Sequence, residues 1–497
     1  MDQLEVAFRA DDDGTFPMTW GQQDFWRHKI RRYADSELRN FNIPVVVDLV
    51  EAGLTGQAAV TAALRRLVER NQSLRGYFFD SPGGSVQRIA RSGTFRLQVR
   101  QSTAAASRST AEALVAGLAE RPFDHEAEWG VRFGLVCVGE STRHVVFAIS
   151  HLVADGGGVK ALIDDFLGVL RARPEGTEPE RRWQPSDQVS RELSERGTRR
   201  TQAAIRHWRK HLEQIPPSMF AAALPAGQPR FRGLRMDSRA LAFTSARLAA
   251  QCQVSVSSAV LGGTAAALTA LTGQPTCVLV LVVGNRYDEE MRGMLGAASQ
   301  DGLFAIGLRG GTIADAVRAT HRAATTAYFS GHYDPAAVEE LVEVVAAERG
   351  VRFDLTLLYN DLSAFANGAG EAGQPASESD ARKLLEETVI VPQRTWEGQL
   401  CKMYLAAVPG MDNCRLTLIA DTAYLPLDRM RALLAGIEKI VFEAAYRDVT
   451  IAEVPALTGL TPAIGTRAGE RNPLSPFPLG AISATDLRDN SLVRVVS

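Results

Sequence analysis

The chain has 497 residues, of which 45% are hydrophobic and 23% are charged, a composition typical of globular proteins with two or three domains. Its 55 lysines and arginines nearly balance 57 aspartates and glutamates, so the net charge of -2 predicts no general attraction to nucleic acid or to an anionic membrane. Five scattered cysteines show neither a CxxC pair nor metal-ligand spacing, which favours reduced thiols in a cytoplasm over a disulfide framework.

The N-terminus, MDQLEVAFRADDDG, lacks the basic start and the apolar core of a signal peptide. The longest apolar run, CVLVLVV at 277–283, is too short to span a bilayer and is typical of a buried strand. We therefore expect a soluble, cytoplasmic protein with neither nucleic-acid nor membrane partners.

Strand-like and helix-like segments alternate along the first part of the chain. Runs of β-branched residues predict strands, and apolar residues at helical spacing predict helices. In chain order we expect a strand at 41–50, a helix at 55–71, two strands at 73–80 and 85–90 around Pro82-Gly83-Gly84, two strands at 131–140 and 144–151, and a helix at 158–173.

A change of composition then divides the chain. The segment 174–187 is rich in Pro, Glu, Arg and Gly, which is typical of a linker, and a basic helix is expected at 191–215, before Pro216-Pro217. A second α/β stretch follows, with helices expected at 257–273, 313–329 and 427–445 and strands at 277–285, 353–361 and 414–421. We therefore expect lobes at 1–175 and 231–450, a linker and connecting helix at 176–230, and an extended tail at 451–497.

The most informative segment for chemistry is ISHLVADGGG at 149–158. The expected strand ends at His151, the glycines beyond Asp155 permit a sharp change of direction, and a helix follows. Imidazole is the side chain best suited to serve as a base near neutral pH, as acyl transfer to an amine or hydroxyl requires. Asp155 would hold the loop, and Gly156 would let the backbone approach a reacting carbonyl. The same spacing also occurs in plain turns, so these residues alone leave both interpretations open.

Other catalytic and cofactor motifs are absent from the sequence. His207-x-x-x-His211 has helical spacing but lacks the glutamate of a metalloprotease, and it lies among basic residues typical of a solvated face. No GxxxxGK[ST], GxGxxG or GxSxG motif is present. We therefore expect no metal site and no tightly bound cofactor.

The spacing His151-x-x-x-Asp155-Gly156, between an apolar strand and an amphipathic helix, resembles the signature of the condensation-domain and chloramphenicol-acetyltransferase-like superfamily. Five other segments resemble motifs of nonribosomal-peptide condensation domains in the expected order, over roughly residues 15–450. MTWGQQDFW (18–26) is similar to S-x-A-Q-x-R-L-W, LVERNQSLRGYF (67–78) to R-H-E-x-L-R-T-x-F, AIRHWRKHL (204–212) to Y-W-x-x-x-L, VVGNR (282–286) with MLG (294–296) to the G-x-R region, and RFDLTL (352–357) to K-F-D-L-T-L.

The resemblance implies an α/β fold of two acetyltransferase-like lobes that form a V with a central tunnel, with His151 midway along it. It also implies that Asp155 is structural and forms an ion pair with Arg286 across the lobes, and that Arg75 is structural. Ser299 and Asn360 are candidates for substrate contacts.

Two departures from the family pattern bear on function. Many condensation domains have two histidines in this motif, and here the first position is Ser150, which weakens the assignment to an ordinary peptide-elongating domain. The family's F-V-N element is replaced by AASQD at 297–301. We therefore expect an unusual acceptor side.

The resemblance leads us to expect a free-standing condensation enzyme of secondary metabolism, such as antibiotic or nonribosomal peptide biosynthesis. With His151 as general base, it would transfer an acyl group from a thioester to a small-molecule amine or hydroxyl. The thioester would be a phosphopantetheine arm on an acyl or peptidyl carrier protein, or coenzyme A. A coenzyme A-dependent O-acyltransferase and a catalytically silent recruitment domain stay open as alternatives. The candidates for carrier docking are Arg27, His28, Lys29, Arg31 and Arg32, although an ordinary solvated helix face is the slightly favoured interpretation of these residues.

Overall fold

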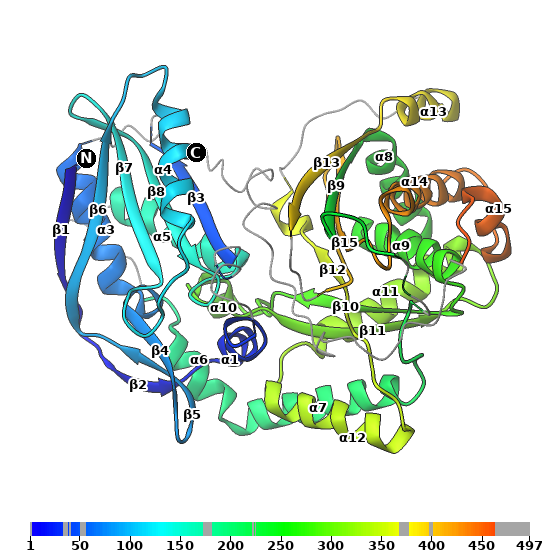
Figure 1. Ribbon diagram of the computed structural model, residues 1–497, viewed down its shortest axis with the longest axis horizontal. Coiled ribbons are helices and arrows are strands. Elements are labelled where there is room, and N and C mark those ends of the chain that lie inside the picture. The colour runs from blue at the N-terminus through cyan, green and yellow to red at the C-terminus, as the bar shows by residue number, and fades with distance from the viewer. Residues whose placement is uncertain are drawn as a thin grey trace. The chain divides into compact units, whose positions relative to one another are not determined.

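The computed structural model describes residues 2–32, 38, 41–49, 56–171, 181–220, 223, 225–366, 377–396 and 401–462. The chain divides into two compact units (Figure 1). Unit 1 holds the described residues of 1–199 together with Gly284–Gln300, and unit 2 holds those of Arg200–Val283 and those from Asp301 onward.

Unit 1 is built on a five-stranded sheet in the order β1-β6-β7-β8-β3. Neighbouring strands are antiparallel except for β6 and β7, which are parallel. The strands are β1 (Asp2–Arg9), β3 (Asn42–Asp48), β6 (Ser92–Gln101), β7 (Val131–Val138) and β8 (Ser141–Ser150).

Alternation along β8 directs its apolar side chains to two layers of helices. Val146 and Ala148 belong to a buried cluster with Leu114 of α4 (Ser107–Ala119), whereas Phe147 contacts Phe166 of α5, with ring centroids 5.8 Å apart. Since successive strand residues face opposite sides of a sheet, α4 and α5 cover opposite faces. The helix α5 (Gly156–Arg171) also packs against α3 (Gln57–Arg70) (Figure 1).

A small antiparallel sheet, in the order β2-β5-β4, completes unit 1 with several short helices. Its strands are β2 (Gly14–Pro17), β4 (Gly76–Ser81) and β5 (Gly84–Ile89), and the helices are α1 (Trp20–Phe25), the π-helix η1 (Trp26–Ile30), the 3-10 helix η3 (Gln72–Arg75), α6 (Pro185–Glu192) and α10 (Glu289–Gly293). The boundary between the units falls inside α7 (Glu195–Leu212).

Unit 2 is built on a seven-stranded mixed sheet in the order β11-β10-β12-β14-β15-β9-β13. Its strands are β9 (Phe231–Ser238), β10 (Thr276–Val283), β11 (Gln300–Gly307), β12 (Leu357–Asp361), β13 (Val389–Trp396), β14 (Met403–Pro409) and β15 (Cys414–Asp421). Its helices are α8 (Arg239–Cys252), α9 (Val256–Thr272), α11 (Ile313–Phe329), α12 (Pro335–Arg349), α13 (Glu378–Glu386), α14 (Leu427–Ala444), α15 (Val454–Thr458) and the 3-10 turns η4 (Ser363–Phe365) and η5 (Ile451–Glu453).

No single helix in the described ranges is long and apolar enough to cross a membrane. Only α8 and α9 together reach that length and hydropathy, and they meet at an angle of 101°.

The structure differs from the sequence-based expectation in two connecting segments. The basic helix expected at 191–215 is divided between α6 and α7. At the break, the N–H of Arg196 donates to Ser194 Oγ at 3.2 Å, and Gly197 approaches the carbonyl of Glu192 so closely that a Cβ there would lie 1.8 Å from the oxygen. The tail expected to be extended from residue 451 begins with η5 and α15, where a capping box between Thr450 and Glu453 starts the turn. Residues 463–497 of that tail lie outside the described part of the chain.

Candidate active site

His151 lies on a short turn between β8 and α5. The carbonyl oxygen of Ser150, the last residue of β8, accepts hydrogen bonds from the N–H groups of Val153 (2.9 Å) and Ala154 (3.2 Å). The N–H of His151 itself donates to the carbonyl of Phe41 at 3.1 Å. The backbone of the turn is therefore held both locally and by the segment that leads into β3.

The imidazole of His151 is buried, since only 4% of the residue is exposed, and it stacks on Phe25 with ring centroids 5.0 Å apart and planes at 4°. Its Nδ1 is enclosed and has no hydrogen-bond partner among the described residues. Burial lowers the pKa of His151 below the usual 6.5; Asp155 and the residue's own backbone oppose that effect in part, whereas Lys29 adds to it. The ring is therefore neutral at pH 7 and retains one nitrogen lone pair.

Both carboxylate oxygens of Asp155 bind groups of unit 1. Oδ1 accepts from Arg286 Nη2 and from the N–H of Gly158, each at 2.8 Å. Oδ2 accepts from the N–H of Ala298 and from both the N–H and the hydroxyl of Ser299, each at 2.9 Å. Burial alone would raise the pKa of Asp155, but the charge of Arg286 and the N–H donors hold it below its usual value. The carboxylate is therefore ionised and its position is fixed by the protein around it.

The guanidinium of Arg286 forms the other side of this ion pair. Its Nη1 donates to the carbonyls of Met291 (2.6 Å) and Met294 (2.7 Å), and Nη2 also donates to the carbonyl of Gly296 (2.7 Å). A Cβ at Gly157 would lie 2.3 Å from Arg286 Nε. Gly157, in the first turn of α5, is therefore required for Arg286 to approach. This close packing explains the glycine without any role in binding phosphate.

The ion pair lies within unit 1. The expectation that Arg286 belongs to a second lobe and pairs across the lobes differs from the structure, in which Gly284–Gln300 is part of unit 1. The reason is the set of contacts that this segment makes there, including the hydrogen bond from Ser73 Oγ to the carbonyl of Leu295 at 2.6 Å. Ser299, a candidate for substrate contact, donates its hydroxyl to Asp155, and a substrate contact by Ser299 stays a prediction.

Ser150 has a partner that the sequence did not reveal, His125. Nε2 of His125 lies 2.7 Å from Ser150 Oγ, and the same oxygen accepts the N–H of Leu152 at 3.2 Å. A serine hydroxyl offers one hydrogen and two lone pairs, so Ser150 Oγ can bind the N–H of Leu152 and the ring of His125 at the same time. Burial lowers the pKa of His125 to about 4, so its ring is neutral at pH 7.

Aromatic side chains from three segments surround the ring of His125. The centroids of Trp26, Phe78 and Phe123 lie 6.2, 6.3 and 6.2 Å from it. The signal available in the sequence was Ser150 itself, because a hydroxyl at the buried end of a strand needs a partner. Nothing in the local pattern around residue 125 identifies that partner.

Arg75 and Asn360 are distant in sequence from the turn that carries His151, and each is held by contacts within its own unit. Arg75, which is 1% exposed, donates to the carbonyls of Asp12 (2.8 Å) and Ala90 (2.7 Å) and pairs with the Asp12 carboxylate in unit 1. Asn360, on β12 of unit 2, donates from Nδ2 to Tyr404 Oη at 2.9 Å. A substrate contact by Asn360 stays a prediction.

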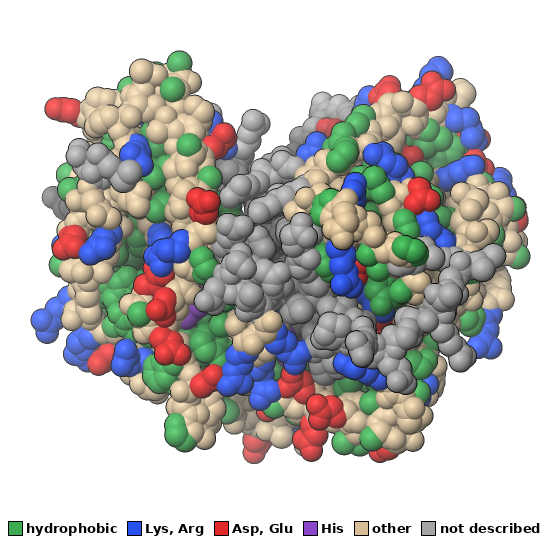
Figure 2. Space-filling model, viewed as in Figure 1, with side chains coloured by type: hydrophobic (Ala, Val, Ile, Leu, Met, Phe, Trp, Pro, Cys, Tyr) green, Lys and Arg blue, Asp and Glu red, His purple; other side chains and the backbone are tan. Residues whose placement is uncertain are grey.

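The basic residues 27–32 do not form one exposed face. His28 and Lys29, on the π-helix η1, are only 1% and 3% exposed, and Arg31 is bound to Asp80 with distances of 3.1 and 2.6 Å. On the face shown in Figure 2, basic and acidic side chains are interspersed over the described surface. In the part of the chain that the structure describes, no group of three or more His, Cys, Asp or Glu side chains could hold a metal ion.

Replacement of Asp155 or Arg286 by alanine should each lower the free energy of unfolding by about 3–5 kcal/mol, because each leaves a buried charge without its partner. The double variant should lose less than the sum of the two, because it leaves neither charge behind. Urea unfolding of the four proteins measures this coupling.

The exposed pair Lys160–Asp164 on α5, at 2.7 Å, is the matched control for that cycle. Alanine at either position should change the free energy of unfolding by less than about 1 kcal/mol. If the losses of unfolding free energy for Asp155→Ala and Arg286→Ala simply add in the double variant, the two side chains are not energetically coupled.

Ser150→Ala and His125→Phe should each destabilise unit 1 by about 1–3 kcal/mol and shift the ring resonances of His151, because the turn loses its hydrogen bond. Two-dimensional spectra of protein with ¹⁵N-labelled histidine rings measure the shift. The control is a second buried histidine–serine pair, formed by His144 Nε2 on β8 and Ser107 Oγ on α4 at 3.2 Å. Ser107→Ala should destabilise the protein without moving the His151 signals. Unchanged His151 signals in Ser150→Ala would show that the turn is held without this bond.

The comparisons with known proteins agree on one family. The family model of the condensation domain matches residues 14–297, more than half of the chain. The chain is 29% identical over 170 residues to the probable non-canonical nonribosomal peptide synthetase CymA of Salinispora arenicola, covering 34% of this chain and 2% of that protein. It is also 29% identical over 177 residues to the dimodular nonribosomal peptide synthase of Bacillus subtilis, covering 36% of this chain and 7% of that protein.

Solved structures with the same fold include two condensation domains of large synthases. The condensation domain that mediates chain release from the enacyloxin polyketide synthase aligns with a TM-score of 0.65 and 16% identity, over 88% of this chain and 84% of that chain. The starter condensation domain of the rhizomide synthetase RzmA, in complex with C8-CoA and Leu-SNAC, aligns with a TM-score of 0.62 and 19% identity, over 87% and 95% of the two chains. The resemblance inferred from the motifs and the α/β fold are both confirmed, and the chain belongs to the condensation domain family.

Proposed function

We propose that this protein transfers an acyl group from a thioester to an amine or hydroxyl, with His151 as the general base. Membership of the condensation domain family points to acyl or peptidyl transfer. The observation that supports His151 is its neutral, stacked imidazole at the end of β8, on a turn that hydrogen bonds fix on both sides.

The base works through its unprotonated ring nitrogen. Since Nδ1 is enclosed by protein, we assign the lone pair to Nε2. Nε2 takes the proton of the acceptor N–H or O–H while that atom attacks the thioester carbonyl and forms a tetrahedral oxyanion. When the oxyanion collapses, the C–S bond breaks, and the leaving thiolate takes the proton from the imidazolium, so that an amide or ester and a free thiol result.

Asp155 acts as a positioning residue in this proposal, not as a second base. Its carboxylate is occupied by Arg286, Ser299 and backbone N–H groups, and it is ionised, so it favours the imidazolium that forms as the acceptor is deprotonated. We assign the main-chain N–H of Gly156, at the first turn of α5, as a donor to the oxyanion, since helix N-termini stabilise negative charge.

The acyl donor in this proposal is a phosphopantetheine thioester on a carrier protein. The curated relatives named above are nonribosomal peptide synthetases, and the chain spans only 2% and 7% of their lengths. The RzmA structure contains C8-CoA, so coenzyme A is the competing donor. The role of this reaction in secondary metabolism belongs to the same proposal.

His151→Ala should lower kcat/KM for acyl transfer by roughly two to four orders of magnitude, the usual range for loss of a general base. In the wild type, kcat/KM should fall on the acid side with a midpoint below pH 6.5, because burial lowers the pKa of His151 and only the neutral ring is active. Thermal melts check that the variant is folded. Near wild-type turnover by a folded His151→Ala protein would favour the alternative of a silent recruitment domain or of substrate-assisted transfer.

The donor is tested by presenting one acyl group on a carrier protein, on coenzyme A and on a short pantetheine thioester. The carrier should give the highest kcat/KM, and its advantage should weaken as salt rises, because charge-steered docking is screened over about 8–10 Å. Equal use of coenzyme A at every salt concentration would contradict the carrier assignment and leave the acyl transfer proposal standing.

A further inference from the structure

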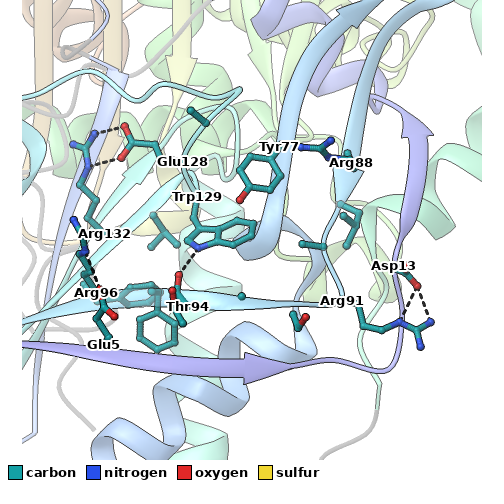
Figure 3. Close-up of a pocket in the computed structure, with 18 of the residues that line it drawn as sticks. Glu5, Asp13, Tyr77, Arg88, Arg91, Thr94, Arg96, Glu128, Trp129 and Arg132 are labelled. Atoms are coloured by element: carbon teal, nitrogen blue, oxygen red, sulfur yellow. Dashed lines mark hydrogen bonds and ion pairs between the residues drawn. The ribbon is translucent and has the colours of Figure 1, made fainter.

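Unit 1 contains a cavity of about 970 Å³ whose lining includes neither His151 nor Asp155 (Figure 3). It lies between the five-stranded sheet and the small β2-β5-β4 sheet, and residues of both contribute to it. A volume of this size is at the upper end of the range that small-molecule sites occupy.

Strand registers place two polar rows along the cavity. On the large sheet, β1 and β6 pair Glu5 with Arg96. Thr94, Arg96 and Gln98 line the cavity at alternate positions of β6, and the buried Phe95 between them also contributes to its lining. On the small sheet, Thr15 of β2, Arg88 of β5 and Tyr77 of β4 lie in one cross-strand row, so their side chains share a face. The cavity is therefore lined by the outward rows of two different sheets.

Trp129 forms an aromatic platform in this cavity. Its indole N–H donates to the carbonyl of Thr94 at 2.9 Å, and its ring lies edge-on to Phe8 with centroids 5.6 Å apart. A Cβ at residue 93 would lie 2.8 Å from the indole, so Gly93 makes room for it. The ring of Tyr77 lies 4.5 Å from that of Trp129, and Figure 3 shows the two rings next to each other.

The charges around the platform are mostly positive. Five arginines and three acidic residues line the cavity. Arg91 pairs with Asp13 at 2.7 Å and Arg96 with Glu5 at 3.5 Å, and all four of these side chains are about half exposed or more. Such exposed pairs are weak and can exchange their partners.

Arg88 is the exception among these arginines, because it contacts no carboxylate among the described residues. Its guanidinium lies over the rings of Tyr77 and Phe79, 5.1 and 5.7 Å from their centroids. Burial raises the pKa of Tyr77, so its phenol stays protonated and can donate a hydrogen bond. A guanidinium fixed by ring stacking, with its N–H donors available, is suited to a carboxylate, sulfonate or phosphate.

We propose that this cavity binds a small aromatic anion, with the ring against Trp129 and Tyr77 and the charged group at Arg88. Offset or edge-to-face packing on two aromatic rings accounts for the aromatic part, and the excess of arginines accounts for the charge. Such a molecule could carry a carboxylate or a phosphate, and binding there requires none of the residues proposed for acyl transfer.

The test compares two fluorescent probes that differ by one anionic group, 8-anilinonaphthalene-1-sulfonate and N-phenyl-1-naphthylamine. The wild type should bind the sulfonate more tightly than the neutral probe. Arg88→Gln should weaken the sulfonate about tenfold and leave the neutral probe unchanged, because it removes the charge contact only. Trp129→Leu should weaken both probes. Benzoate and phenyl phosphate then compete for the site, and the stronger competitor identifies the preferred charged group.

Arg108→Gln, an exposed arginine on α4 paired with Glu112, is the matched control and should bind both probes as the wild type does. His151→Ala should also bind them unchanged, which separates this site from the acyl transfer proposal. Thermal melts establish that each variant is folded, and the exposed Arg88→Gln carries the test if Trp129→Leu does not fold. The proposal is overturned if folded Arg88→Gln binds the sulfonate with wild-type affinity, or if neither benzoate nor phenyl phosphate displaces it.

Discussion

The architecture of the candidate site depends on one buried carboxylate, that of Asp155. It joins three parts of unit 1. These are the turn after β8, the first turn of α5 through Gly158, and the segment 284–300 through Arg286 and Ser299. A buried charge is costly unless it is paired and hydrogen-bonded. The N–H groups, the hydroxyl and the guanidinium around Asp155 meet that requirement, and in doing so they fix the backbone from which His151 projects.

The same region shows how a family motif can tolerate a substitution at a buried position. Ser150 stands where many condensation domains have a histidine, and its hydroxyl is hydrogen-bonded to His125, which comes from the segment before β7. The imidazole is thus supplied from another part of the chain, and the hydroxyl connects it to the turn. The apolar surroundings formed by Trp26, Phe78 and Phe123 keep the ring of His125 neutral.

Local pattern predicted most of the elements that place the site. The runs at 144–151, 277–283 and 414–421 form β8, β10 and β15, because a continuous or alternating apolar run has few stable alternatives to a buried strand. The family resemblance, not the local pattern, implied the Asp155–Arg286 pair; the structure contains this pair, but within unit 1 and not across two lobes. Local pattern could not predict that 284–300 joins unit 1 or that His125 meets Ser150, because these contacts depend on tertiary packing over long sequence separations. It also indicated a basic helix face at His28 and Lys29, whereas the π-helix η1 buries both.

The membership of segment 284–300 in unit 1 has a consequence for the order in which the protein is made. Asp155 and Arg286 are 131 positions apart, and β10 of unit 2 is synthesised between them. On the ribosome, the turn that carries His151 therefore leaves the exit tunnel long before its counter-charge exists. Until residues 286–299 follow, the carboxylate has to stay hydrated, and the turn cannot close around it in its final form. The candidate site is thus completed only after the first part of unit 2, Arg200–Val283, has been synthesised.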